Sequence, residues 1–325
     1  MRKELLRLLK KNKQDYISGE QICRQLGVSR TAIWKHMESL RKMGYQIEAR
    51  SNAGYRLISI PDRIYPEEIE DNLDTSVIGK KIRYSASVTS TNEHAKEWAG
   101  EGAPEGAVYL AEEQGFGKGR LGRGWFSPRG KGLWFSVVVR PKINPVDVPQ
   151  ITLVAAVAIA ASIYKATGLI PGIKWPNDLL AEKGKLCGIL TEMNADMDRV
   201  EYVVIGAGLN VNITSGDIPR ELQGVVTSIA METGKKTDRV QLMQTILREM
   251  DYWYRTWLEE GFKPVLKHWK KWNITLGNKV EVSTFREVVA GTAIDVDENG
   301  ALVVRLDSGE HKRFIAGEVS LRRDK

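Results

Sequence analysis

The sequence contains few of the residues that usually bind metals or form disulfides. Its 325 residues include only two cysteines, Cys23 and Cys187, which lie far apart and form no C-x-x-C motif. The four histidines show no metal-ligand spacing. These absences argue against a disulfide framework and against a zinc site. They predict a reduced, cytoplasmic protein with no metal site built from protein groups alone.

Long hydrophobic runs are missing as well. The longest apolar stretch, residues 151–164, is alanine-rich and too short to cross a bilayer, so it predicts a buried core helix. Residues 1–5 lack the apolar run and the small-residue cleavage site of a secretory signal peptide. We therefore expect no association with a membrane.

Basic charge is concentrated at one end of the chain. The formal net charge is +7, and residues 1–62 contain 13 Lys and Arg against 6 Asp and Glu, whereas the remaining residues contain 35 of each. Such an excess is typical of a domain that binds a polyanion, although a basic face can also serve solubility alone. With 42% hydrophobic residues the chain can bury a large core, and its length favours two or three domains.

The basic N-terminal segment shows the pattern of a winged helix-turn-helix. Leucines at helical spacing near the start predict a first helix, and the capping box at 18–21 starts a second. Ser29 is a good N-cap for a third helix that ends at Gly44. Two short strand-like runs then predict a hairpin wing, 45–49 and 55–59.

The third helix would present its N-terminal side chains to the major groove of DNA. The predicted DNA-contacting residues are Ser29, Arg30, Thr31, Trp34 and Lys35. The alternative is a protein-interaction module in which Trp34 is part of the core. The agreement between the helix pattern and the charge distribution favours DNA binding.

One segment of the chain is both glycine-rich and basic. Residues 114–125 contain five glycines, three cations and a tryptophan. The glycines let backbone N–H groups approach a ligand, and the cations complement phosphate or carboxylate. Residues 117–122 match the dinucleotide pattern G-x-G-x-x-G, but proline and glycine follow where that motif requires a helix. Because strand-like runs flank the segment, we predict an ordered anion-binding loop; a solvated basic loop is the alternative.

The remaining pattern predicts a multidomain α+β protein. After a polar, proline-bracketed linker, strand-like runs alternate with helical segments, which favours an α/β sheet backed by helices, either parallel or mixed. The predicted strands are 81–87, 107–113, 133–139, 185–193 and 202–209, and the predicted helices are 91–99, 149–167 and 237–260. In residues 276–325, apolar and polar residues alternate and hairpin turns separate the runs. This pattern predicts a small SH3-like β-barrel. The predicted segments are therefore a winged helix-turn-helix over 1–62, a linker over 63–80, a central domain over 81–273 and a barrel over 274–325.

Several polar groups lie at the ends of the predicted strands. Residues 90–92 can cap a helix or bind a ligand through their hydroxyl and amide groups. Lys174, Asn177 and Asp178 suit a phosphate and Mg²⁺, although an ordinary turn has the same composition. Taken alone, Lys185 at the head of an apolar strand favours an edge charge over a catalytic lysine.

Together, these elements resemble the bacterial bifunctional biotin protein ligases that also repress the biotin operon. The resemblance spans essentially the whole chain. It rests on motifs in the same order, namely Ser90-Thr91-Asn92, Gln114 followed by Gly117 to Trp125, Lys174 to Asp178, Gly184 to Leu190, and Gly206 to Asn210. One departure is Lys118, where the family's loop often has arginine; the charge is kept, but the bidentate fork is lost.

The resemblance implies ATP-dependent ligation of biotin, through biotinyl-5'-AMP, to a lysine on the biotin carrier domain of a carboxylase. Mg²⁺ would accompany ATP, within reach of Asp178. The implied catalytic residues are Lys185 and Arg120. The implied biotin-binding residues are Ser90, Thr91, Asn92, Gln114, Gly117, Lys118, Gly119, Arg120, Lys185 and Gly188. The implied nucleotide-binding residues are Arg120, Arg123, Trp125, Lys174, Asn177 and Asn210, with Arg322 on the same side.

The resemblance also gives the N-terminal segment a role. Biotinyl-AMP would be the corepressor, and the adenylate-bound protein would form a homodimer on two-fold operator DNA. Ordering of residues 114–125 would promote that dimer. Three alternatives stay open. A purely sensory biotin repressor would not need the loop cations, and a lipoate ligase-like enzyme would not need an operator-binding domain. A plain DNA-binding protein with a structural core would leave the glycine-rich basic loop unexplained.

Overall fold

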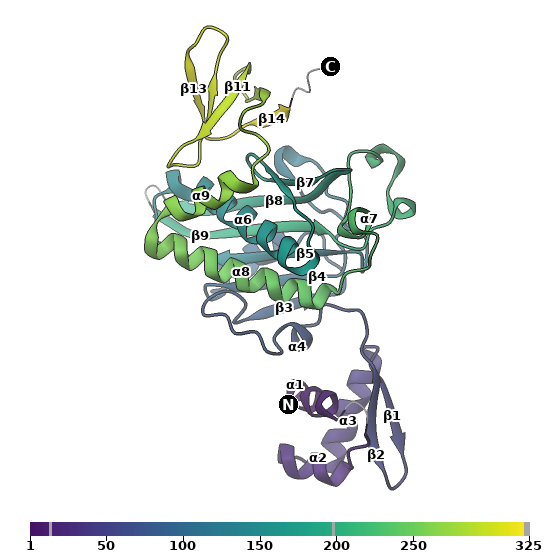
Figure 1. The fold of residues 1–325 in the computed structure, drawn as a ribbon. Helices are drawn as coiled ribbons and strands as arrows, with labels where there is room; N and C mark the ends of the chain where they lie inside the picture. Colours follow the sequence, from purple (N-terminus) through teal and green to yellow (C-terminus); the bar gives the residue numbers. More distant parts are fainter. Residues whose placement is uncertain (13–14, 197–198, 322–325) are drawn as a thin grey trace. The chain divides into compact units, whose positions relative to one another are not determined.

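The computed structural model describes residues 1–12, 15–196 and 199–321. The chain forms two compact units, Met1–Asn72 and Leu73–Lys325. Figure 1 shows the helices and strands of both. Arg322 of the predicted site lies outside the described residues.

The first unit has the predicted order of helices and hairpin. Its elements are α1 (Arg2–Lys11), α2 (Gly19–Leu26), α3 (Arg30–Lys42), β1 (Gln46–Arg50), β2 (Gly54–Ser59) and α4 (Pro66–Ile69). Ser18 Oγ accepts a hydrogen bond from Gln21 N (3.1 Å), and Ser29 Oγ accepts one from Ala32 N (3.2 Å). The helix-turn-helix, both N-caps and the hairpin are therefore confirmed.

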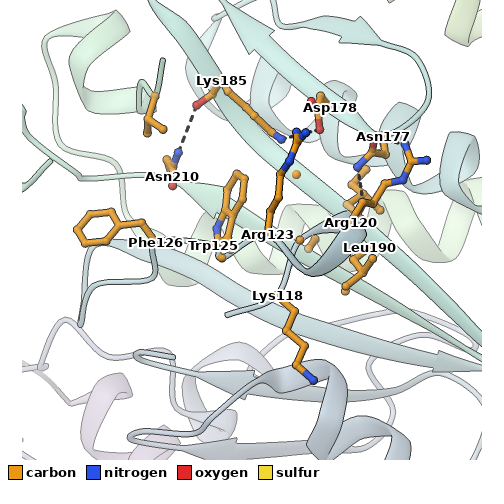
Figure 2. A pocket seen from close by; sticks show the side chains of 18 of the residues that line it. Lys118, Arg120, Arg123, Trp125, Phe126, Asn177, Asp178, Lys185, Leu190 and Asn210 are labelled. Carbon is orange, nitrogen blue, oxygen red and sulfur yellow. Dashed lines mark hydrogen bonds and ion pairs between the residues drawn. The ribbon is translucent and has the colours of Figure 1, made fainter. Parts of the chain in front are cut away.

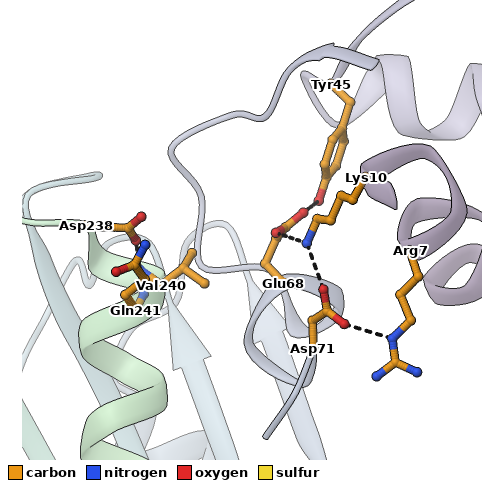
Figure 3. Close-up of polar contacts among 8 residues, drawn as sticks. All are labelled: Arg7, Lys10, Tyr45, Glu68, Asp71, Asp238, Val240 and Gln241. Atoms are coloured by element: carbon orange, nitrogen blue, oxygen red, sulfur yellow. Dashed lines mark hydrogen bonds and ion pairs between the residues drawn. The ribbon is translucent and has the colours of Figure 1, made fainter. Parts of the chain in front are cut away.

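An acidic segment that includes α4 packs against α1 within this unit (Figure 3). Glu68 accepts hydrogen bonds from Tyr45 Oη (2.7 Å) and Lys10 Nζ (2.6 Å). Asp71 pairs with Arg7 (2.8 Å) and Lys10 (3.2 Å). The first part of the predicted linker thus belongs to the first unit, which contains 14 Lys and Arg against 10 Asp and Glu. Part of the basic excess is neutralised inside the unit.

The second unit is built on a mixed sheet of strand order β3-β4-β5-β9-β8-β7-β6. The strands are β3 (Ile82–Ser85), β4 (Ala107–Ala111), β5 (Gly132–Val139), β6 (Gly172–Lys174), β7 (Asp178–Ala181), β8 (Gly184–Asp196) and β9 (Arg199–Asn210). β3 runs parallel to β4, and the other neighbours are antiparallel. The predicted strands are confirmed, whereas the short strands β6 and β7 were not predicted.

Helices precede, separate or follow the strands of this sheet in the chain. They are α5 (Thr91–Gly100), α6 (Val148–Thr167), α7 (Ile229–Thr233), α8 (Arg239–Glu260) and α9 (Phe262–Trp272), with short 3-10 turns η1 (Arg120–Gly122), η2 (Pro145–Asp147), η3 (Ser215–Asp217) and η4 (Arg220–Leu222). Figure 1 shows α6, α8 and α9 together in front of the sheet. α6 is long and apolar enough to span a membrane, yet 72% of its apolar window is buried in the fold. Its burial, rather than its length, identifies it as the predicted core helix.

The polypeptide that leads into the sheet is fixed to α8. The carboxylate of Asp251 accepts hydrogen bonds from the backbone N–H groups of residues 76–78 at 2.6 to 3.0 Å. Burial alone would raise the pKa of Asp251, but these hydrogen bonds and Arg255 hold that pKa below its usual value of 3.8. The last part of the predicted linker is therefore an ordered part of the second unit.

The C-terminal segment forms an antiparallel sheet of order β13-β12-β11-β10-β14. Its strands are β10 (Lys279–Ser283), β11 (Val288–Val296), β12 (Leu302–Arg305), β13 (His311–Phe314) and β14 (Glu318–Leu321). Trp175 Nε1 donates to Gly300 O (3.0 Å), and Gln150 Nε2 donates to Glu298 O (3.3 Å). The predicted small β domain is thus present, and its contacts place it in the same compact unit as the central sheet.

Candidate active site

A cavity of about 410 Å³ lies between the central sheet, the glycine-rich loop and strand β14 of the C-terminal sheet. Every residue predicted to bind biotin or nucleotide lines it, except Gly117 and the undescribed Arg322. Asp178 lines it as well. Figure 2 shows side chains of the loop and of β7 and β8 around this space. The fold therefore brings together motifs that are far apart in the sequence.

The floor of the cavity consists of glycines on paired strands. Gly188 of β8 lies directly opposite Gly208 of β9. A Cβ on Gly206 would lie 1.9 Å from Asn92 Oδ1, and one on Gly208 would lie 2.2 Å from Trp125 Nε1. Any larger residue at these positions would collide with the side chains above it. The glycines thus allow α5 and the loop to approach the sheet closely.

Polar side chains at the start of α5 form one end of the cavity. Gln114 Oε1 accepts hydrogen bonds from Thr91 N (2.8 Å) and Thr91 Oγ1 (3.1 Å). Gln114 Nε2 donates to Ser127 Oγ (2.8 Å), which leaves its second hydrogen for a ligand. Ser90, also at this end, is 2% exposed and lines the cavity. This end can both donate to and accept from a small neutral ligand.

Sequence reasoning missed Ser136, which lies beneath these groups on β5. Its Oγ is 2.6 Å from Asn92 Oδ1 and 2.8 Å from Thr91 Oγ1, and the residue is fully buried. The available signal was a lone hydroxyl in the otherwise apolar strand 132–139. A buried hydroxyl needs a hydrogen-bond partner, so its presence in such a strand indicates a polar contact.

Lys185 lies at the opposite end of the cavity, near the start of β8. Its Nζ is 2.8 Å from Asp178 Oδ1 and 5.1 Å from the centre of the Trp125 ring. Lys174 pairs in register with Asp178 and also lines the cavity. Burial lowers the pKa of Lys174. Two lysines beside one carboxylate make this end suited to an anion.

Each of the three loop cations already has a protein partner. Lys118 Nζ pairs with Glu93 Oε1 (2.9 Å), and Figure 2 shows its side chain directed away from Lys185. Arg120 Nη1 donates to Asn177 Oδ1 (3.2 Å) and to Gly317 O (3.0 Å). Burial lowers the pKa of Arg120. Arg123 Nη2 pairs with Glu318 Oε2 at 2.7 Å. A bound phosphate would have to replace some of these protein partners.

The loop is structured by its own hydrogen bonds. Gly119 N donates to Arg123 O (2.7 Å), and Trp125 N donates to Gly117 O (2.7 Å). A Cβ on Gly117 would lie 2.6 Å from Trp125 O. Gly117 therefore shapes the loop without lining the cavity. The expectation of an ordered loop between strands is confirmed.

Two of the predicted nucleotide-binding residues already have structural contacts. The Trp125 ring lies against Gly188 and Gly208, and within the described residues its buried Nε1 has no hydrogen-bond partner. Asn210 Nδ2 donates to Thr227 O (3.0 Å) and Lys185 O (3.3 Å). Asn210 thus fixes the backbone at Lys185, whereas Trp125 has a donor available at the cavity floor.

The predicted DNA-contacting residues form an exposed face in the first unit. The side chains of Ser29, Arg30, Thr31, Trp34 and Lys35 are all exposed. Trp34 is 55% exposed, so the alternative in which it belongs to the core is wrong. The Ser29 hydroxyl caps α3, so it is partly engaged.

Comparison with known proteins divides the chain into three matched segments. A family model described as HTH domain matches residues 2–56, and one described as the biotin/lipoate A/B protein ligase family matches residues 84–210. A third, described as the biotin protein ligase C terminal domain, matches residues 275–322. These segments correspond to the helix-turn-helix, the sheet that lines the cavity, and the C-terminal sheet.

Similar proteins extend over nearly the whole chain. The bifunctional ligase/repressor BirA of Bacillus subtilis is 40% identical over 97% of each chain. The Escherichia coli protein of the same name is 32% identical over 95% of this chain and 94% of its own. Among solved structures, biotin protein ligase from Aquifex aeolicus in complex with biotin and ATP has a TM-score of 0.65 at 28% identity, covering 75% of this chain and 100% of that chain.

Proposed function

Because the chain belongs to the family of bifunctional biotin ligase/repressors, we propose that it activates biotin with ATP and transfers it to a lysine of a carrier domain. Each predicted segment has its own role in this proposal. Residues 1–62 bind DNA, residues 81–273 perform the chemistry, and residues 274–325 complete the cavity wall. The observation that supports the chemistry most directly is Lys185 at one end of a cavity whose other end is neutral and polar.

The first step joins two anions, so positive charge must offset their repulsion. A carboxylate oxygen of biotin attacks the α-phosphorus of ATP, and the bond from that phosphorus to the oxygen of the leaving pyrophosphate breaks. Lys185 and Arg120 would stabilise the charge on the α-phosphate and the biotin carboxylate. Lys174 and Arg123 would bind the nucleotide phosphates. Because Arg120 and Arg123 now bond to protein groups, this role requires them to change partners when the nucleotide binds.

The neutral end of the cavity suits the cyclic urea of biotin. A urea offers two N–H donors and one carbonyl acceptor, which need acceptors and donors in return. Ser90, Thr91, Asn92 and Gln114 supply both kinds of group. The glycines between the two ends leave room for a bicyclic ligand and its chain.

The cavity also has oxygen donors suited to the Mg²⁺ that accompanies ATP. Asp178 and Asn177 line it, and no group of three metal-binding side chains occurs within the described part of the chain. One or two protein oxygens suit Mg²⁺, which keeps waters and phosphate oxygens as its other ligands. When bound, Mg²⁺ neutralises charge on the phosphates; Asp178 would contribute to holding it there.

The second step transfers the biotinyl group to the carrier. The amine of a carrier lysine attacks the acyl carbon, the bond to the AMP oxygen breaks, and the amine loses a proton to solvent. Until the carrier arrives, the mixed anhydride must be protected from water. The glycine-rich loop and the Trp125 ring would shield it, with Trp125 also packing against the adenine side.

We propose further that the adenylate-bound protein forms a homodimer that occupies operator DNA through α3. Exposed Arg30 and Lys35 support this role. A rearrangement of residues 114–125 on adenylate binding would promote the dimer. Sedimentation with and without biotin and ATP tests this step, and an unchanged mass over a wide concentration range would argue against it.

Biotin-dependent release of pyrophosphate from ATP tests the ligase itself. We expect release by the wild-type protein, a loss of at least about a hundredfold in Lys185→Ala, and little change in Lys183→Ala, whose amine instead bonds to Met231 O at 2.7 Å. Labelling of a biotin carrier domain should follow release. Biotin binding without release would favour a purely sensory repressor, and stronger competition by lipoate would favour a lipoate ligase-like enzyme.

A further inference from the structure

A chain of alternating charges runs from the glycine-rich loop to the neutral end of the cavity. Lys118 pairs with Glu93 (2.9 Å), and Lys96 lies 3.0 Å from the same Glu93 oxygen. Lys96 Nζ also lies 2.9 Å from Glu192 Oε1. The other oxygen of Glu192 accepts a hydrogen bond from Asn92 Nδ2 at 2.7 Å. Glu192 is not among the residues predicted for the site, yet it contacts one of them directly.

The surroundings of Asn92 determine which way its amide points. Asn92 Nδ2 donates to Leu190 O (3.1 Å) as well as to Glu192, and a carbonyl and a carboxylate can only accept. The atom that faces both must therefore be the nitrogen. Asn92 Oδ1 then lies 2.6 Å from Ser136 Oγ, above the glycine floor at Gly206. Both amide hydrogens are used inside the protein, while Oδ1 keeps a second lone pair.

We propose that Glu192 is a positioning residue of the ligand site, fixing the Asn92 amide so that it offers a ligand only an acceptor. The inference rests on the proposed function, since it assigns the Asn92 oxygen to an N–H group of the biotin urea. Without the Glu192 carboxylate, one amide hydrogen loses its partner and the side chain can rotate. A rotated Asn92 amide would place its NH2 group where Oδ1 now lies, so a hydrogen-bond donor would face the N–H donor of the urea.

The salt bridge to Lys96 strengthens this arrangement. Burial alone would lower the pKa of Lys96, but its bonds to Glu192 and Glu93 raise that pKa, so Lys96 stays charged beside both carboxylates. Glu192 and Lys96 are each about a third exposed, at 31% and 32% of the side chain. The pair therefore lies at the surface and is not part of the buried core. Changing Glu192 should leave the fold intact.

The test compares biotin affinity with ATP affinity in the full-length protein. Glu192→Met keeps the aliphatic stem and removes the acceptor. We expect its dissociation constant for biotin, measured by calorimetry, to rise about tenfold, which corresponds to about 1.4 kcal/mol. The KM for ATP in pyrophosphate release and the midpoint of thermal unfolding should be unchanged. Glu192→Gln still accepts from Asn92 and should stay within about threefold of wild type.

A matched control lies between β8, the strand of Glu192, and its neighbour β9. Asn194 Nδ2 donates to Glu201 Oε2 at 2.8 Å, the same type of contact outside the cavity lining. Glu201→Met should bind biotin like wild type. A biotin analogue methylated on its urea nitrogens provides the specificity readout: it should lose affinity for the wild-type protein, and less for Glu192→Met, where the amide can turn.

The outcomes separate the inference from the proposed function. Wild-type affinity in Glu192→Met, or equal losses of biotin and ATP affinity, would overturn the positioning role while leaving the ligase intact. An equal loss for the methylated analogue in both proteins would also overturn it. A wild-type protein that binds no biotin would instead refute the proposed function itself. If Glu192→Met does not fold, a tenfold loss in Glu192→Gln would contradict the proposal, because the acceptor is retained.

Discussion

Replacing Arg239 by methionine should strongly destabilise the second unit. Arg239 Nη1 lies 3.0 Å from Glu112 Oε2 and 3.2 Å from Gly132 O, and the two side chains of the ion pair are fully buried. Methionine retains much of the aliphatic volume but removes the guanidinium. The Glu112 carboxylate then remains inside the protein and has lost the Arg239 guanidinium.

The expected loss is large because breaking a buried pair from one side leaves a charge uncompensated. Such changes cost about 3–5 kcal/mol, a substantial part of the roughly 5–15 kcal/mol that stabilises a typical domain. A matched control lies on the same helix. Arg248 pairs with Asp74 at 2.7 Å, with the side chains 39% and 80% exposed. Arg248→Met should cost at most about 1 kcal/mol.

Denaturant unfolding followed by tryptophan fluorescence measures both variants. Eight of the nine tryptophans lie in the second unit, so the signal reports on the correct part of the chain. The midpoint should shift strongly for Arg239→Met and hardly for Arg248→Met. Equal shifts, or a loss below about 1 kcal/mol for Arg239→Met, would refute the reasoning.

Three further predictions follow from the site and the folded units. Gly208→Ala should displace Trp125, because the new Cβ would lie 2.2 Å from its Nε1, and should reduce pyrophosphate release at least about tenfold; Gly216→Ala, with open space around it, should not. Asp251→Asn should lower the free energy of unfolding at neutral pH. It should also make that free energy depend less on pH in the acid range. The pKa of this carboxyl is depressed in the folded state, so its contribution is complete above the ordinary value of 3.8 and is lost as the pH falls through the folded value; an unchanged stability-versus-pH curve would contradict this. Arg30→Ala should weaken operator binding in a filter or anisotropy assay. If Arg30 contacts a phosphate, the slope of the logarithm of the binding constant against the logarithm of the salt concentration should fall in magnitude by about 1. Retained affinity and slope would exclude Arg30 as a contact.

Local pattern was sufficient for the elements whose signals are continuous in sequence. The apolar run 133–139 predicted a strand because a fully buried strand has few polar residues, and the structure has that strand as 132–139. Ser29 predicted the start of α3 because its hydroxyl satisfies a free N–H of the first turn. The motifs that line the cavity were also identified, mainly through the family resemblance.

Features that depend on distant partners were not predictable from pattern. Strands β6 and β7 span only 3 and 4 residues, too few to show alternation. The partners of the loop cations come from elements far away in sequence, such as Glu318 for Arg123. Glu68 belongs to the polar linker predicted over 63–80, yet it is 5% exposed and bonded to Tyr45. Which charges meet is decided by the tertiary fold.

The glycine floor limits how this site can be altered. Gly188, Gly206 and Gly208 already have the smallest possible side chain, so no substitution there can enlarge the space for a bulkier relative of the ligand. Every substitution at these positions would reduce the volume of the cavity. Acceptance of a larger substrate, whether through engineering or drift, would therefore have to come from the walls, for example from Leu190 or Val226, which line the same cavity and can be shortened.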